Sequence, residues 1–472
     1  MLFNDYPFLL VFLPAAILLY RFADPYPKAR IGTMVLLSFA FYGYGNPPFL
    51  LLLALSILIN WLAAAGYGRI KSRTKSKTKA ETKAKALLTA VIVLDLAVLG
   101  VFKYANFVSY NVGLLLGISM PPLDLALPLG ISYFTFHHIM YLADLRSGKA
   151  PLYSLDRYAL YICFFPQAIA GPLARWSEVM QQFGRQVYVP GWQRTFCIGI
   201  VFIAIGLFEK IVLGDRIADL LDPIYERAKA GPLVDGDSWL ALTFSFQILF
   251  DFAGYSDVAI GLGLLFGIRL PFNFNAPMRS TSIQDFWQRW HMTLMNFLRD
   301  YVFHPLANFR VVPRRFFPVQ YFAAMLATMM LCGLWHGASW TFVLWGALHG
   351  LALVLCSLWR RYGPRLPWLL GWGLTVLFVL LTGVIFRAGA LDAAWNVFQG
   401  LAIAPGLERG RHMLPILIFP LLTILLPASQ DIVAFLTHKP RPLLAGLLGF
   451  GLLALLLEIG EREVHEFVYF QF

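Results

Sequence analysis

A single histidine, His336, lies within an apolar stretch of the chain between two tryptophans, in the run LWHGASW of residues 334–340. Burial disfavours the charged form of an imidazole, and a neutral imidazole is what a general base needs. Gly337 follows directly, and a glycine lets a backbone or a ligand approach closely. The alternative is a structural histidine bonded to a nearby carbonyl, and hydrophobic periodicity alone does not separate the two.

A second histidine, His291, ends the run DFWQRWH of residues 285–291. If this run is helical, Trp287 lies one turn below His291 and Asp285 one turn below Arg289, which places an ion pair beside a histidine on an aromatic platform. The alternative is an interfacial belt of tryptophan and arginine that anchors a membrane helix. Both interpretations stay open at this point.

Gln247, Asp251 and Tyr255 recur every four residues in a third apolar run and so share one helix face. They could line a polar passage, but hydrogen-bonded contacts between helices explain them at least as well. Three further histidines are interpreted as structural or as cavity-lining: His137, His138 and His349.

The elements that must position these residues are membrane helices. The chain has 472 residues, of which 59% are hydrophobic and only 14% are charged, whereas a soluble protein carries about 25% charged residues. Runs of about 18 or more apolar residues indicate membrane-spanning helices. We expect an all-α polytopic membrane protein with about eleven or twelve transmembrane or re-entrant helices, several of them short, near residues 8–20, 31–44, 49–68, 87–102, 106–118, 125–142, 155–170, 195–213, 239–267, 319–337, 340–359, 367–386, 414–427 and 442–458.

The net charge of +12 comes from basic residues between apolar segments, a pattern that sets membrane orientation and does not indicate nucleic-acid binding. We interpret residues 69–86 as a basic cytoplasmic loop, or less simply as a lipid-binding patch. Two crossings separate it from the basic turn around Lys28, so the N-terminus should be periplasmic. The N-terminus lacks a basic signal-peptide start, and the four cysteines suggest neither a disulfide nor a metal site.

Residues 271–318 differ from the rest of the chain because prolines and asparagines open the segment and an amphipathic stretch follows from Ser282 to Asp300. Ser282 is a plausible N-cap, with Asp285 three residues later. We expect a single domain over residues 1–472, in which this segment is a cytoplasmic-side helix that lines a cavity. The chain contains no Walker loop, no H-E-x-x-H and no G-x-S-x-G.

Taken together, the chain resembles the membrane-bound O-acyltransferase superfamily, and within it the bacterial alginate O-acetyltransferase branch. The resemblance rests on blocks that recur in order along the chain: LPLGISYFTF (127–136) with YLAD (141–144), FPQAIAGP (165–172), FDFAGYSDVAIG (250–261), FWQRWH (286–291), RDYV (299–302), WHGA (335–338) and VYFQF (468–472).

The resemblance implies that helices surround a central catalytic tunnel, with His336 as the catalytic base and His291 as a second functional position. We predict that Trp287, Trp290, Trp335, Gln247, Asp251, Tyr255 and Ser339 line the tunnel, and that Arg289, Arg299 and Asp300 hold the donor. It implies no bound cofactor. The donor would be acetyl-CoA or an acyl-carrier thioester from the cytoplasm, and the acceptor a polysaccharide beyond the inner membrane, reached with a periplasmic acetyltransferase partner.

One block departs from the family pattern. Where the family often reads R-D-Y-x-x-x-P-L-G-G, this chain has His304 before the proline and Ala307-Asn308 in place of the two glycines, which leaves the polysaccharide open between alginate, cellulose and peptidoglycan. Three rival functions remain. One is D-alanyl transfer to teichoic acid from a carrier-protein thioester, and another is acyl transfer to a lipid. The third is a membrane transporter, although the sequence shows no matching halves.

Overall fold

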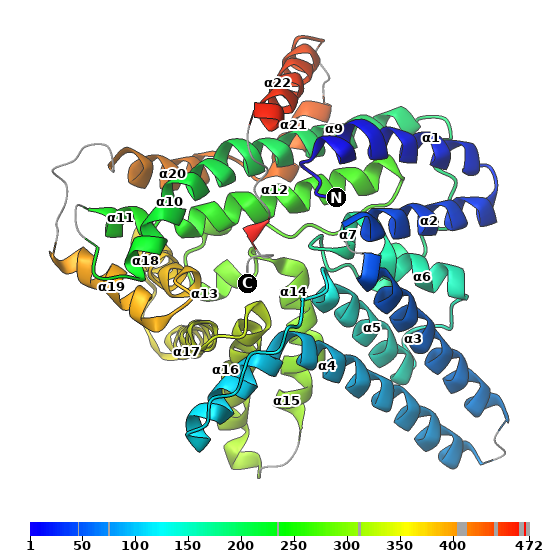
Figure 1. Cartoon of the computed structure of the whole chain (residues 1–472), viewed down its shortest axis with the longest axis horizontal. Coiled ribbons are helices and arrows are strands. Elements are labelled where there is room, and N and C mark those ends of the chain that lie inside the picture. Colours follow the sequence, from blue (N-terminus) through cyan, green and yellow to red (C-terminus); the bar gives the residue numbers. More distant parts are fainter. Residues whose placement is uncertain are drawn as a thin grey trace. The chain divides into compact units, whose positions relative to one another are not determined.

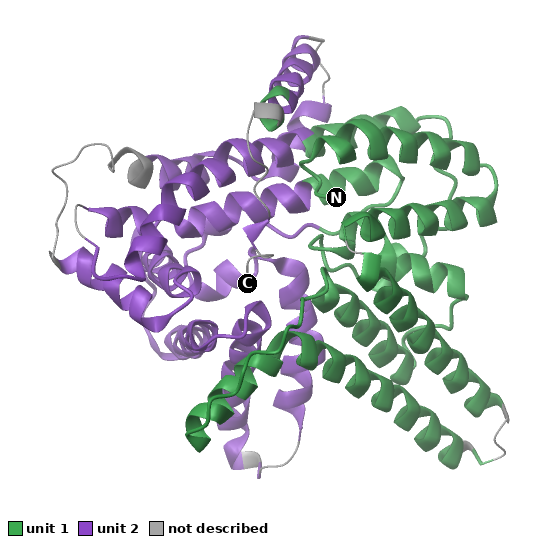
Figure 2. Cartoon of the chain, in the orientation of Figure 1, with its two compact units in different colours: residues 1–203, 258–271, 457–464 green, residues 204–257, 272–456, 465–472 purple. Residues whose placement is uncertain are grey.

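A computed structural model describes residues 1–45, 47–73, 76–233, 236–309, 313–403, 413–438, 442–461 and 467–468 (Figure 1). Within these residues the chain is helical and contains no strand, which confirms the all-α prediction. The helices form two compact units (Figure 2), unit 1 with residues 1–203, 258–271 and 457–464, and unit 2 with residues 204–257, 272–456 and 465–472. The single domain over residues 1–472 stays a prediction.

Unit 1 is formed mainly by the first half of the chain. Its core contains edge-on and tilted ring contacts among Phe8, Phe41 and Phe165. Its elements are the π-helix η1 (Pro7–Phe12), α1 (Leu13–Ala23), α2 (Pro27–Gly45), α3 (Pro47–Arg73), α4 (Lys77–Leu116), α5 (Ile131–Arg146), α6 (Leu155–Cys163), α7 (Phe165–Ala168), α8 (Trp176–Val179) and most of α9 (Trp192–Leu207).

Unit 2 contains every residue that we predict for the site. Its elements are η2 (Phe208–Gly214), α10 (Asp215–Ala228), α11 (Asp237–Ala241), most of α12 (Phe244–Leu265), η3 (Pro277–Arg279), α13 (Ile283–Trp287), α14 (Met292–Phe297), η4 (Leu298–Phe303), α15 (His304–Asn308), η5 (Arg314–Phe316), α16 (Phe317–His336), α17 (Trp340–Tyr362), α18 (Trp368–Arg387), α19 (Leu391–Ile403), α20 (Met413–Leu425), α21 (Ser429–His438) and most of α22 (Pro442–Glu461).

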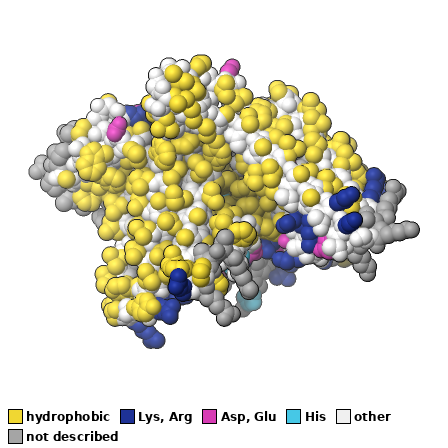
Figure 3. All heavy atoms as spheres, turned by 90° about the horizontal axis from the view of Figure 1, so that it is seen from below, with side chains coloured by type: hydrophobic (Ala, Val, Ile, Leu, Met, Phe, Trp, Pro, Cys, Tyr) yellow, Lys and Arg dark blue, Asp and Glu magenta, His cyan; other side chains and the backbone are white. Residues whose placement is uncertain are grey.

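Seven helices among the described residues are long and apolar enough to cross a membrane, or eight if the bent pair of α20 and α21 counts as one span. The other apolar segments that we predicted are shorter, such as Pro7–Ala23 and Leu443–Ile459. Large hydrophobic side chains are strongly exposed, Leu115 by 87% and Phe22 by 78%. Figure 3 shows hydrophobic side chains over most of the face in view and Lys and Arg in small groups near its edges. The chain is therefore a multi-pass membrane protein.

The basic segment 69–86 is mostly helical and not an open loop, because α3 continues to Arg73 and α4 begins at Lys77. Lysine is its commonest residue and is interspersed with alanine, and both favour helix. The two helices predicted over 87–102 and 106–118 are likewise one helix, α4, of 40 residues. At 1.5 Å per residue α4 is about 60 Å long, roughly twice the thickness of the hydrocarbon core.

The helix predicted from Ser282 to Asp300 is broken into short pieces. Ser282 does cap α13, since its hydroxyl accepts the backbone N–H of Asp285 at 3.1 Å. The helix then stops at Trp287, and α14 begins only after His291. The break follows from His291, whose backbone is left-handed with φ of +41°, a conformation that cannot continue an α-helix.

Candidate active site

His336 is the last residue of α16 and is 5% exposed. Its imidazole is surrounded by aromatic rings, with centroids at 4.7 Å for Trp335, 5.3 Å for Trp345 and 5.0 Å for Phe386, all edge-on. The chain turns sharply after it, and Ser339 caps α17 by accepting the backbone N–H of Thr341. A helix end therefore delivers the imidazole into an aromatic enclosure, as the tryptophans beside it in the sequence predict.

The helices α16 and α17 are held together through glycines, which fixes the position of His336 relative to Trp345. A Cβ atom on Gly333 would lie 2.1 Å from the carbonyl oxygen of Phe342, and one on Gly346 would lie 2.3 Å from that of Met329. Small residues let two helix backbones touch in a membrane, where close packing replaces hydrophobic association. Any larger residue at these two positions would push the hairpin apart.

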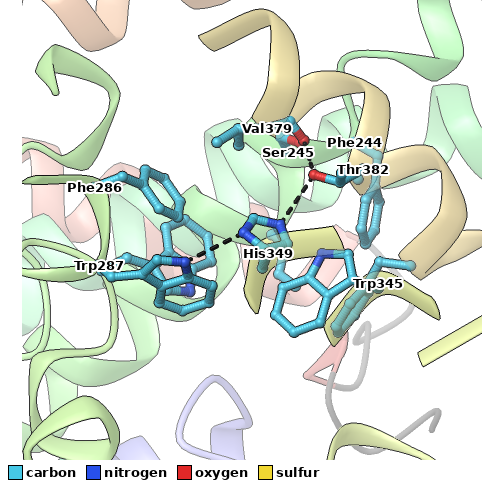
Figure 4. A pocket seen from close by; sticks show the side chains of 12 residues that line it. Phe244, Ser245, Phe286, Trp287, Trp345, His349, Val379 and Thr382 are labelled. Carbon is cyan, nitrogen blue, oxygen red and sulfur yellow. Dashed lines mark hydrogen bonds between the residues drawn. The ribbon is translucent and has the colours of Figure 1, made fainter. Parts of the chain in front are cut away.

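His349 lines a small cavity that Figure 4 shows from close by. Trp345 and Phe386, which pack on His336, line the same cavity. Its Nδ1 accepts the indole N–H of Trp287 at 3.2 Å, so the ring proton resides on Nε2. Nε2 donates to the hydroxyl of Thr382 at 3.1 Å, and that hydroxyl donates to the carbonyl of Phe378. This histidine is locked as a hydrogen-bonded neutral ring.

The cavity beside His349 has a volume of about 40 Å³. Phenylalanine and tryptophan rings form half of its wall, and its serine, threonine and histidine side chains bond to the protein. It is lined by Phe244, Ser245, Ile248, Phe286, Trp287, Trp290, Trp345, His349, Val379, Thr382, Gly383 and Phe386. Of the predicted tunnel residues, Trp287 and Trp290 line this cavity. His349 lines the cavity and is held by two hydrogen bonds, in agreement with its interpretation from the sequence as a structural or cavity-lining residue.

His291 lies between α13 and α14 and is 1% exposed. Asn273 fixes its tautomer: the amide oxygen accepts the backbone N–H of Thr293, so the same oxygen must accept the proton on His291 Nδ1 at 3.2 Å. Nε2 of His291 has no hydrogen-bond partner among the described residues. Burial lowers the pKa of His291 to about 3, so the ring is neutral at physiological pH.

Trp335 connects the two predicted catalytic histidines. Its ring centroid is 6.2 Å from that of His291 and 4.7 Å from that of His336. On its other side His291 packs edge-on against Phe252 at 4.6 Å. The structure thus brings His291, Trp335 and His336 together, although 45 residues of sequence separate the histidines. We call these two histidines, with His349 and their aromatic neighbours, the imidazole group.

The polar face of α12 belongs to a different arrangement. Asp251 pairs with Lys210 at 2.7 Å, and Lys210 also pairs with Asp215. We call these three residues the lysine cluster. Asp251 further accepts the backbone N–H of Val468 at 2.9 Å, and the neighbouring Tyr255 stacks on Phe467 at 4.9 Å. Lys210 was not predicted from the sequence, although a lysine inside an apolar span is itself a signal.

The residues predicted to hold the donor are partly exposed and pair with each other. Arg289 bonds to Asp285 at 2.8 Å, as the four-residue spacing predicts. Arg299 pairs with its neighbour Asp300 at 2.7 Å. His304, the departure from the family pattern, is exposed in α15 and lies 3.9 Å from Asp300. None of these residues lines the cavity beside His349.

The remaining predicted residues have local roles in the described structure. Gln247 is buried in α12 with 2% exposure, and the hydroxyl of Ser339 also donates to the carbonyl of Gly389. His137 Nδ1 lies 2.9 Å from the carbonyl of Tyr133, and His138 Nδ1 lies 2.6 Å from the hydroxyl of Tyr158, both within unit 1. These two histidines are held by bonds of a structural kind.

Comparison with known proteins establishes the family. The model of the membrane-bound O-acyltransferase family matches residues 80–387, and this range contains His291, His336 and His349. The chain belongs to the membrane-bound O-acyltransferase family and is an O-acyltransferase.

Several curated relatives are similar over most of their length. A peptidoglycan O-acetyltransferase of Helicobacter pylori is 35% identical over 434 residues, which covers 85% of this chain and 80% of that protein. A probable alginate O-acetylase of Pseudomonas aeruginosa is 36% identical over 408 residues, covering 85% and 75%. A teichoic acid D-alanyltransferase of Bacillus subtilis is 29% identical over 254 residues, covering 53% and 64%.

Proposed function

We propose that this protein moves an acetyl group from a cytoplasmic thioester, acetyl-CoA or an acyl carrier, to an extracytoplasmic polysaccharide such as alginate, cellulose or peptidoglycan. The observation that carries the proposal is the buried imidazole of His336 at a helix end, enclosed by rings, in a chain whose relatives at 35–36% identity are named as O-acetyltransferases. The location that follows is the inner membrane, with the N-terminus periplasmic and the basic segment 69–86 cytoplasmic.

In the proposed mechanism His336 is the general base. Its neutral ring takes the proton of the acceptor hydroxyl as that oxygen attacks the thioester carbonyl. The new C–O bond forms, the C–S bond breaks, and the departing thiolate takes the proton back from the imidazolium, so that the histidine ends neutral. Aromatic walls that exclude water keep the two reactants in place, which supplies much of the remaining acceleration.

The geometry refines the proposed part of His291. With its proton on Nδ1, its Nε2 can only accept a hydrogen bond. A group that only accepts cannot polarise a carbonyl oxygen, but it can orient the hydroxyl that attacks. We therefore assign His291 to the acceptor and not to the thioester. Trp335, between the two histidines, is the wall against which both reactants would lie.

The experiment compares three proteins in a strain that lacks the gene: the unmodified chain, His336→Ala and His304→Ala. His304 is a matched control because it is the same residue type in an exposed position. Acetyl esters on the alginate, cellulose and peptidoglycan fractions are measured at equal membrane levels of protein. We expect His336→Ala to lower them by a factor of about 100 or more and His304→Ala to leave them unchanged. Ester levels in His336→Ala equal to those of the unmodified chain would refute the assignment of the base.

A second candidate function is D-alanyl transfer, because teichoic acid D-alanyltransferases are among the relatives. In that case the donor would be a carrier-protein thioester with D-alanine as cargo. The same strains distinguish the candidates: D-alanyl esters that disappear in His336→Ala, with acetyl esters unchanged, would select the second. The transfer to the polysaccharide is also expected to need a periplasmic partner enzyme.

A further inference from the structure

Two of the aromatic rings that pack on His336 also line the cavity beside His349. Phe386 and Trp345 each lie about 5 Å from His336, at 5.0 and 5.3 Å between ring centroids, and both also line the cavity beside His349. Phe386 comes from the end of α18 and is 3% exposed. An acyl group whose carbonyl stands at His336 therefore has these rings as its neighbours.

The cavity beyond the two rings suits an apolar occupant. Its serine, threonine and histidine side chains bond to protein atoms: Ser245 donates to the carbonyl of Val379 at 3.1 Å, Thr382 donates to that of Phe378, and both nitrogens of His349 are engaged (Figure 4). A cavity whose hydroxyls and imidazole are already bonded offers few partners to a water molecule and favours hydrocarbon.

The cavity is also small. An engineered protein cavity that holds benzene measures about 150 Å³, whereas this one measures about 40 Å³. It can take a group of roughly the size of one water molecule or methyl group. Phe386 packs on His336 and also lines this volume, so a longer acyl chain at His336 would meet the phenyl ring before it reached the cavity.

We propose that Phe386 is a specificity-determining residue that restricts the transferred acyl group to two carbons, by separating His336 from the apolar cavity beside His349. This inference rests on the proposed acetyl transfer. It predicts that removal of the ring joins the cavity to the space at His336 and admits propionyl and butyryl groups, whose extra methylenes take the place of the lost phenyl ring.

The test uses membranes that contain the full-length protein and three labelled donors, acetyl-CoA, propionyl-CoA and butyryl-CoA, with label in the polysaccharide fraction as readout. In Phe386→Ala we expect the ratio of butyryl to acetyl transfer, as kcat/KM, to rise on the order of tenfold or more over the unmodified chain, because one methylene in an apolar pocket changes specificity by 10–200-fold. Phe386→Leu, a milder change, should favour propionyl over butyryl.

Phe342→Ala is the matched control. Phe342 is equally buried at 3% and packs on Phe386 at 4.8 Å, but it does not line the cavity. It should lose the same ring packing and keep the acyl ratio of the unmodified chain. An unchanged ratio in both Phe386 variants, or an equal change in Phe342→Ala, would overturn the inference while acetyl transfer still supports the proposed function. If the unmodified chain transfers no acyl group, the proposed function itself fails.

Discussion

Unit 2 buries polar side chains in two ways. The lysine cluster of Lys210, Asp215 and Asp251 keeps full charges inside a membrane span and compensates them by direct pairing. The imidazole group lies among aromatic side chains, and Nε2 of His291 has no partner among the described residues. In the lysine cluster the charged side chains are used in bonds to one another and to the backbone, whereas in the imidazole group one ring nitrogen of His291 keeps the capacity to accept a hydrogen bond.

The largest effect is expected from breaking the lysine cluster. Lys210→Met leaves two buried carboxylates without their cation, which costs about 3–5 kcal/mol. Thermal unfolding in detergent, followed by tryptophan fluorescence, should show a large fall in Tm. Lys229→Met is the control, since Lys229 is 55% exposed and pairs with an exposed Glu226, and its loss should matter by less than about 1 kcal/mol. Equal Tm values for the two variants would contradict the view that the lysine cluster stabilises the fold.

A smaller effect should appear as a pH dependence of the imidazole group. The pKa of His291 is about 3 in the folded chain and close to 6.5 when unfolded. Between these two values His291 is protonated in the unfolded state and neutral in the folded state. Stability is therefore lost as the pH falls. For one such group the loss between pH 7 and pH 5 is about 2 kcal/mol.

His291→Asn tests this dependence, since asparagine tolerates the left-handed backbone and does not titrate. From pH 7 to pH 5 the variant should lose about 2 kcal/mol less stability than the unmodified chain, measured by unfolding in detergent at both values. A difference below about 0.5 kcal/mol would mean that His291 is protonated without cost, against its burial among rings.

The smallest effect is expected at Arg289, which pairs with Asp285 at the surface with 35% and 29% of the side chains exposed. Such pairs contribute about 0–1 kcal/mol, so Arg289→Met should unfold within about 1 kcal/mol of the unmodified chain. The same variant also tests the prediction that Arg289 contacts the thioester donor. A raised KM for the thioester at unchanged stability would place Arg289 at the donor, and an unchanged KM would make it a surface pair only.

The sequence predicted the class of fold and the position of His336 well, because both depend on local signals. Apolar runs define membrane helices, and a histidine flanked by tryptophans indicates an aromatic enclosure. The short helices around residues 283–308 were not predictable in the same way. Their pattern of tryptophans and charges suits one amphipathic helix, and the left-handed backbone at His291 is imposed by tertiary contacts such as the bond to Asn273.

The partners that polar residues find far along the chain could not be predicted from the sequence either. Asp251 repeats with Gln247 and Tyr255 on one helix face, which suggested a shared passage, but its partner Lys210 comes from η2 and a further donor from Val468, 217 residues away. The hydrogen bond that His349 accepts from Trp287 and the one it donates to Thr382 likewise join three helices. Helical periodicity identifies a face and carries no information on what packs against it.

The left-handed backbone of His291 has a consequence for how this protein can change. Holding a residue other than glycine in that conformation costs about 1–3 kcal/mol, and glycine would adopt it with little strain. At this one position glycine would relieve the backbone strain but would remove the imidazole. We therefore expect selection for thermal stability alone to replace His291, and a variant selected in this way should transfer acyl groups more slowly.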